Sequence, residues 1–235
     1  MQYLGGKHRQ SKHIAGILEL AGGGAYWEPF LGGGSVAAAV ARTEAFDTMH
    51  LSDMHVDLVM MWQALVDGWL PPEHVSEDEY VALKLADPSA ERGFVGFACS
   101  FASKWFGGYA REGKRGHVNF AAVGGRGLAK KVVPLQAVAN VTVTNCGYTD
   151  VTPIACDVLY LDPPYASATG YSTGGFDSAA FWAWAQEHAE SGVRVFVSEF
   201  KAPDGWRPVW SVERKANHIG AAKVDVESLY CWSGI

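Results

Sequence analysis

Apolar and polar residues follow two different periods along the chain, which predict strands and helices in turn. Short apolar runs at residues 157–161 and 193–197 are bounded by polar residues, which is typical of buried strands in a parallel sheet. Further strands are predicted at residues 25–29, 46–52, 141–144, 206–212 and 224–232. Helices are predicted at residues 11–21, 35–42, 56–65 and 178–190. This order predicts an α/β fold with a mostly parallel sheet and a late antiparallel hairpin.

Residues 71–131 interrupt this pattern. Ser76–Glu79 resembles a capping box at the start of an acidic helix that ends near Ala86. The aromatic-rich residues 94–106 are expected to be helical, and residues 107–120 are expected to form a loop in which glycines alternate with cations. We therefore predict a mainly helical subdomain at 71–131, inserted into a main domain of residues 1–70 and 132–235.

Charge is distributed unevenly along the chain. The net charge is −6, but residues 101–135 carry seven Lys and Arg residues against one Glu, a local charge of +6 that leaves −12 for the remainder. Such asymmetry indicates a surface that binds a polyanion, although a solvated basic loop would have the same composition. The candidates for phosphate contacts are Lys104, Arg111, Lys114, Arg115 and Arg126.

The four cysteines and the N-terminal residues narrow the class of protein. No cysteine belongs to a CxxC pair, which predicts reduced thiols, no structural zinc and a cytoplasmic protein. The first residues contain no apolar signal-peptide core, and no stretch approaches 18 apolar residues, so neither a signal peptide nor a membrane span is expected.

A glycine-rich loop joins the first predicted strand to the helix at 35–42. It reads Glu-Pro-Phe-Leu-Gly-Gly-Gly-Ser at residues 28–35, a strand, glycine loop and helix typical of nucleotide-binding α/β folds. Ala37 occupies the third glycine position of the dinucleotide fingerprint, which argues against an oxidoreductase. The loop carries no basic residue, so it favours a cofactor without phosphates, such as S-adenosylmethionine. Glu28 is then a candidate partner for the ammonium of its amino acid moiety.

Asp53 ends the second predicted strand, 19 residues beyond Gly34. An acid at this point holds ribose hydroxyls in nucleotide-binding α/β folds. The alternative role for Asp53 is the N-cap of the helix at 56–65. The spacing favours the ribose role.

Asp162-Pro163-Pro164-Tyr165 directly follows the apolar strand at 157–161. The two prolines stiffen the turn, so a carboxylate, a backbone carbonyl and an aromatic ring are held at fixed mutual positions. The carboxylate and the carbonyl of Pro163 can accept the N–H bonds of an aromatic amine and stabilise the positive charge that develops during its alkylation. The tyrosine ring can stack on the heterocycle. Alone, the tetrapeptide is also compatible with an ordinary turn at a strand end.

Four motifs in this order resemble the Dam-like adenine-specific DNA N6-methyltransferases of the alpha group, especially small phage-type members. Tyr3–Lys7 is similar to the N-terminal cofactor motif of that family, and residues 28–35 to its methionine-binding loop. Asp53 is similar to its ribose-binding acid, and Asp162–Tyr165 to its catalytic tetrapeptide. The basic insert lies between Asp53 and the tetrapeptide Asp162–Tyr165. This order of cofactor loop, insert and catalytic motif is that of the alpha group. Residues 104–109 lack the Arg-(Phe/Tyr)-Asn pattern of the GATC-methylating members, so the target sequence stays open.

The resemblance implies a Rossmann-like methyltransferase sheet with an inserted target-recognition subdomain at 71–131. It implies methyl transfer from S-adenosyl-L-methionine, without a metal, to N6 of an adenine flipped out of double-stranded DNA. The implied catalytic residues are Asp162, Pro163, Pro164 and Tyr165. The implied cofactor-binding residues are Tyr3, Gly5, Gly6, Lys7, Glu28, Pro29, Phe30, Gly32, Gly33, Gly34, Ser35, Asp53 and Asp162.

Two alternatives stay open at this point. The first keeps the chemistry and changes the acceptor to the N4 amine of cytosine or to an RNA adenine; Asp rather than Ser at position 162 argues against cytosine. The second is a DNA-binding protein that kept the fold and lost catalysis, against which the intact tetrapeptide argues. The sequence leaves the oligomeric state open between a monomer and a weak dimer.

Overall fold

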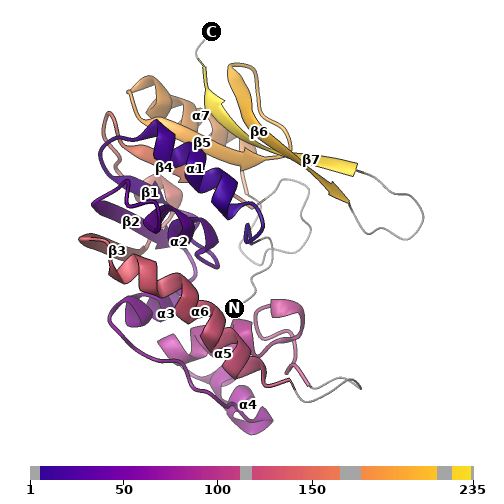
Figure 1. Ribbon diagram of the computed structural model, residues 1–235. Coiled ribbons are helices and arrows are strands. Elements are labelled where there is room, and N and C mark those ends of the chain that lie inside the picture. Colours follow the sequence, from indigo (N-terminus) through magenta and orange to yellow (C-terminus); the bar gives the residue numbers. More distant parts are fainter. Residues whose placement is uncertain (1–5, 112–117, 165–175, 216–223, 234–235) are drawn as a thin grey trace.

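The computed structural model describes residues 6–111, 118–164, 176–215 and 224–233. Its strands are β1 (Tyr26–Glu28), β2 (Thr48–Asp53), β3 (Asn140–Asn145), β4 (Val158–Leu161), β5 (Arg194–Glu199), β6 (Trp206–Lys215) and β7 (Val224–Trp232). They form one seven-stranded sheet in the order β3-β2-β1-β4-β5-β7-β6 (Figure 1).

The order and direction of the strands place a topological switch point between β1 and β4. Strands β1 to β5 are parallel, whereas β7 runs antiparallel to both of its neighbours, β5 and β6. The strand order reverses between β1 and β4, and ligands bind outside the carboxyl ends of strands at such a switch point. The predicted α/β fold, with a mostly parallel sheet and a late antiparallel hairpin, is confirmed.

Helices cover both faces of the sheet. The helices outside the insert are α1 (Ser11–Ala21), α2 (Ser35–Ala41), α3 (Val56–Val66) and α7 (Ser178–Glu190). The side chains of β4 alternate between the two faces: Val158 and Tyr160 belong to the core under α1, α2 and α3, and Leu159 and Leu161 to the core under α7. A strand buried on both faces explains the continuous apolar run in the sequence.

The insert is mainly helical, with α4 (Glu77–Leu85), α5 (Ala90–Ala98) and a 3-10 turn η1 (Phe101–Ser103). The predicted capping box is present, because Ser76 accepts from Glu79 N and Glu79 accepts from Ser76 N. The helix predicted at 94–106 is wrong in its bounds: Ser89 caps an earlier start by accepting from Arg92 N. Within the described ranges, no helix is long and apolar enough to cross a membrane.

Helix α6 (Phe120–Gln136) is the main departure from the predicted elements. Residues 120–131 are assigned from the sequence to the inserted subdomain, with no element named for them, and Gly124, Gly125 and Gly127 disfavour helix. In Figure 1, α6 runs as one helix from the group α4–α5 to the edge of the sheet at β3. The boundary predicted between residues 131 and 132 lies inside it, and the division into two domains stays a prediction.

Candidate active site

Asp162 lies directly after β4, at the carboxyl edge of the sheet. Its Oδ1 is 2.5 Å from Lys7 Nζ, and the Asp162 side chain keeps 20% of its surface exposed, whereas that of Lys7 keeps 2%. Lys7 precedes α1, so residues 155 positions apart meet here. Two of the predicted motifs, the N-terminal Lys and the strand-end Asp, are therefore joined by an ion pair.

Glu227, which the sequence reasoning missed, is the second carboxylate on Lys7. Its Oε1 is 3.0 Å from Lys7 Nζ, and its side chain is buried. Because β7 runs antiparallel to β5, its first residues lie beside the carboxyl end of β5. The alternation of residue types in this strand predicts the opposite arrangement, because Val226 is 47% exposed while Glu227 is buried, so the sequence carries no sign of this carboxylate.

Glu199, the last residue of β5, adds a third acid to this edge. Its pKa is raised to about 7, chiefly by burial and also by the charges of Asp162 and Glu227, although the hydrogen bond from Phe200 N and the charge of Lys7 lower it. Its Oε1 accepts a hydrogen bond from Phe200 N at 2.7 Å. Two carboxylates, Asp162 and Glu227, thus contact one buried lysine, and Glu199 lies close enough to sense the charges of all three.

Glu28 is the last residue of β1 and is buried. Tyr26 donates a hydrogen bond to its Oε2 at 2.7 Å. Burial raises the pKa of Glu28 to about 8, Asp162 raises it as well, and the Tyr26 hydroxyl lowers it. Glu28 is therefore an acid that a neighbouring cation would stabilise in its ionised form.

The glycine-rich loop between β1 and α2 needs its glycines. Gly32 and Gly34 have φ values of 46° and 60°, in the left-handed region. A Cβ on Gly34 would lie 2.4 Å from Cζ2 of Trp62, so the backbone packs directly on that ring. Trp62 also donates from Nε1 to Gly32 O at 3.0 Å. Position 34 therefore has no room for a side chain.

Asp53 holds the same loop from the end of β2. Its Oδ2 accepts from Gly32 N at 2.9 Å, and its Oδ1 accepts from His55 N at 2.9 Å. Burial raises the pKa of this carboxyl group. The N-cap of α3 is His55, whose side chain accepts from Leu58 N, so Asp53 does not fill the capping role considered as its alternative.

Lys131 is a further residue whose role at the loop the sequence did not indicate. Its Nζ donates to Gly33 O at 2.5 Å and to Ser35 Oγ at 2.9 Å, and its side chain is buried. Lys131 is one of the seven Lys and Arg residues at 101–135 whose charge predicts a basic surface. Its charge is used inside the protein, and it is withdrawn from that surface.

The other predicted cofactor and catalytic residues lie in different surroundings. Pro29 and Pro163 are buried, and Pro164 is half-buried. The ring of Phe30 stacks on Tyr148, with centroids 5.6 Å apart, within the aromatic cluster on the α7 side. Gly6 is exposed. Tyr3, Gly5 and Tyr165 lie outside the described residues.

The candidate phosphate contacts divide into two groups. Lys104 and Arg126 are exposed, as is Arg111, which is ion-paired with Glu77 of the acidic helix α4. Lys114 and Arg115 lie outside the described residues. The pairing of Arg111 reduces the free positive charge below the value counted along the sequence.

The loop fits a cofactor that carries no phosphate. The nearest basic side chain, Lys131, binds the carbonyl of Gly33 and the hydroxyl of Ser35, so it is not offered to a ligand. A P-loop would instead offer the ammonium of its lysine to a phosphate. Gly32, Gly33 and Gly34 are buried, and Asp53 binds the N–H of Gly32.

Comparison with known proteins agrees with this chemistry. Residues 3–95 match the family described as D12 class N6 adenine-specific DNA methyltransferase. A comparison with curated proteins found no match. Solved structures with a similar chain include a candidate methylase from Haemophilus influenzae, 12% identical, with 94% of this chain and 86% of that chain covered and a TM-score of 0.39.

Two further solved structures are similar. A conserved hypothetical protein from Streptococcus pyogenes is 12% identical, with 93% of this chain and 94% of that chain covered and a TM-score of 0.39. A candidate rRNA methylase from Clostridium thermocellum is 10% identical, with 95% and 96% covered and a TM-score of 0.43. The part of the chain at residues 3–95, less than half of its length, is therefore similar to the D12 class of N6 adenine-specific DNA methyltransferases.

Proposed function

We propose that the enzyme methylates N6 of an adenine flipped out of double-stranded DNA at a specific sequence. The observation that carries the proposal is the placement of Asp162: it follows β4 at the switch point of the sheet, stays partly exposed and is fixed by Lys7. A carboxylate held in one position at a ligand-binding edge can act on a substrate without reorganising.

The chemistry assigned to the strand end follows from the properties of the acceptor. The lone pair of an adenine amine is delocalised into the ring, so the amine is a weak nucleophile. Asp162 and the carbonyl of Pro163 would accept its two N–H bonds and stabilise the positive charge that grows on nitrogen. When bound, S-adenosylmethionine supplies a methyl group activated by the sulfonium charge. Tyr165, outside the described residues, remains our candidate for stacking on the base.

The chain's own groups suit the proposed cofactor. The backbone of residues 32–34 would receive it, with Glu28 beside the ammonium and Asp53 beside the ribose. An approaching cation would favour ionisation of Glu28, whose pKa of about 8 reflects burial. Asp53 would keep its hold on Gly32 N while facing the ribose, so one carboxylate would shape the loop and bind the ligand.

Base flipping and the DNA partner complete the proposal. The amine of a paired adenine cannot reach a site at the carboxyl ends of buried strands, so the base must leave the stack. The insert at 71–131 would hold the duplex, with Lys104, Arg111 and Arg126 as phosphate contacts among its described residues. The reaction would take place in the cytoplasm, on a duplex bound by a monomer or a weak dimer.

Incubation with methyl-labelled S-adenosylmethionine and separate samples of duplex DNA, single-stranded DNA and RNA tests the acceptor. Nucleoside analysis should find the label in N6-methyladenine from duplex DNA. Label in N4-methylcytosine, or in RNA adenine alone, would replace the proposed acceptor. A protein that binds duplex DNA and the cofactor but transfers no label would support the catalytically silent alternative.

A further inference from the structure

The glycine-rich loop is held by a residue from the far side of the insert. Lys131 follows Gly33 by 98 positions and belongs to α6, yet its Nζ donates to Gly33 O and to Ser35 Oγ. The side chains of Asp53 and Trp62, which lie closer to the loop in sequence, bind the N–H and the carbonyl of Gly32. Lys131 is therefore the long-range support of this loop.

The Lys131 ammonium fixes one peptide plane of the loop. The carbonyl of Gly33 points toward Lys131, while the N–H of the same peptide, that of Gly34, donates to Leu31 O at 2.8 Å. The hydroxyl of Ser35 is the second acceptor, at the first residue of α2. Together these contacts set the direction of the backbone where the loop enters the helix.

Helix α6 is itself fixed along its length, so Lys131 acts from a rigid base. In its first half, Gly124 packs so closely on α5 that a Cβ there would lie 2.7 Å from Ala98 Cβ. At its end, Gln136 donates from Nε2 to Leu65 O at 3.0 Å. The helix thus joins the insert to α3 without a break.

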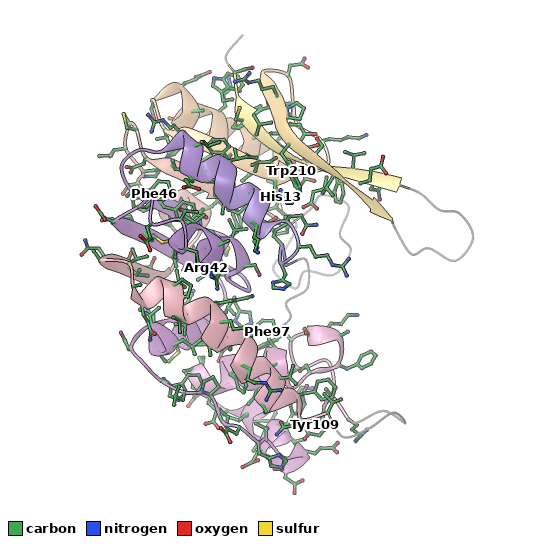
Figure 2. The ribbon with its side chains drawn as sticks, in the orientation of Figure 1. His13, Arg42, Phe46, Phe97, Tyr109 and Trp210 are labelled. Atoms are coloured by element: carbon green, nitrogen blue, oxygen red, sulfur yellow. The ribbon has the colours of Figure 1, made fainter. Side chains whose placement is uncertain are left out.

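A second contact between α6 and α2 depends on a proline. Pro134 has no N–H, so the carbonyl of Lys130, four residues earlier, lacks its usual helical partner. Arg42, at the end of α2, donates to that carbonyl, and it donates from Nη1 to Ala38 O at 2.8 Å. Figure 2 shows Arg42 between the two helices. Both ends of α2 are therefore attached to α6.

Burial of an ammonium group is costly unless its hydrogen bonds are satisfied. Burial lowers the pKa of Lys131 to about 8, and the charge of Glu28 raises it in the opposite direction. The partners that offset this cost are the loop's own groups, so the position of the charge and the shape of the loop depend on each other.

We propose that Lys131 is a positioning residue for the cofactor: from α6 it holds the glycine-rich loop in the shape that binds S-adenosylmethionine. The inference rests on the proposed function only in assigning that ligand to the loop. Lys131 touches no reacting atom and acts through the backbone of Gly33 and the hydroxyl of Ser35.

Titration calorimetry with S-adenosylmethionine, without DNA, tests the role in the full-length chain. Lys131→Met should weaken binding by about 10- to 100-fold, the usual range for a hydrogen bond to a charged group. Lys131→Arg should recover most of that loss, because arginine keeps a permanent cation with several donors. The matched control is Lys130→Met, which removes an exposed ammonium one residue earlier in the same helix and should bind as the wild type does.

A double-mutant cycle with Ser35→Ala shows whether Lys131 acts through the loop. In the Lys131→Met background, Ser35→Ala should cost much less affinity than in the wild type, because its partner is already lost. If Lys131→Met does not fold, Lys131→Gln replaces it in both comparisons. Wild-type affinity in the Lys131 variant, equal losses at Lys130 and Lys131, or no recovery by Arg would overturn the inference. A wild-type protein that binds no S-adenosylmethionine would instead overturn the proposed function.

Discussion

Lys7 and Glu227, near opposite ends of the chain, form a buried ion pair with 3.0 Å between Nζ and Oε1. The same ammonium binds Asp162 at 2.5 Å, so the first and last segments of the chain together fix the strand-end carboxylate. This arrangement requires the antiparallel entry of β7, which brings its first residues to the carboxyl edge of the sheet.

Removal of the shared cation should destabilise the protein. Lys7→Met leaves Glu227 buried and Asp162 mostly buried without a counter-charge, so the free energy of unfolding should fall by about 3–5 kcal/mol. Urea denaturation at pH 8 measures it. The control Lys12→Met changes an exposed lysine of α1 and should leave stability within about 0.5 kcal/mol of the wild type. Equal stability of Lys7→Met and wild type would show that the pair carries no net stabilisation.

The raised pKa of Glu28 should make the stability of the protein depend on pH. Its pKa is raised from 4.5 to about 8 in the folded protein, so the folded state keeps a proton that the unfolded chain releases. Stability should therefore fall as pH rises from about 5 to 8 and level off above that. In Glu28→Gln this fall should shrink by a few kcal/mol. Parallel stability–pH curves for the two proteins, from denaturant titrations, would contradict the assigned pKa.

Gly34 should tolerate no side chain. Gly34→Ala places a Cβ against Trp62 at a backbone φ of 60°, so stability should fall by about 1–3 kcal/mol and affinity for S-adenosylmethionine should fall as well. Gly16→Ala is the matched control, because Gly16 lies inside α1 with open space around it. That change should stabilise the protein by about 0.5–1 kcal/mol. Thermal unfolding and calorimetry compare the two, and indistinguishable variants would refute the packing argument.

The affinity for duplex DNA should depend more strongly on Arg126 than on Arg111. Arg126→Ala should weaken binding and lower the slope of log K against log salt by about 0.9, the value for one lost phosphate contact. Arg111→Ala should cost less, because Arg111 must first leave Glu77. Lys84→Ala, on α4 outside the basic segment, is the control. Fluorescence anisotropy over a salt series measures each slope. An unchanged slope for Arg126→Ala would place the DNA surface elsewhere.

The parts of the site that the sequence predicts are those whose chemistry is local. The strand, glycine loop and helix around Gly32–Gly34, and the acid after β4, depend on residues next to one another, and the fold follows from the periodicity. Lys131 was interpreted as a surface cation because a basic run looks alike whether its members are exposed or buried. Only the path of α6 places Lys131 against the loop.

Tertiary packing explains the remaining differences. Glycines within α6 disfavour helix, but Gly124 allows the helix to approach Ala98, and that packing outweighs its low propensity. Glu227 required the register of β7 against β5, which a single sequence does not contain.

The most direct test of the central claim is the single-turnover rate of Asp162→Ala on duplex DNA, with the yield of N6-methyladenine as the signal. Wild-type protein should form N6-methyladenine. The variant, checked to be folded and to bind duplex DNA, should be slower by about 100-fold or more, because it lacks the group that stabilises charge on the amine. A folded Asp162→Ala protein that forms N6-methyladenine at a near-normal rate would contradict the role given to Asp162.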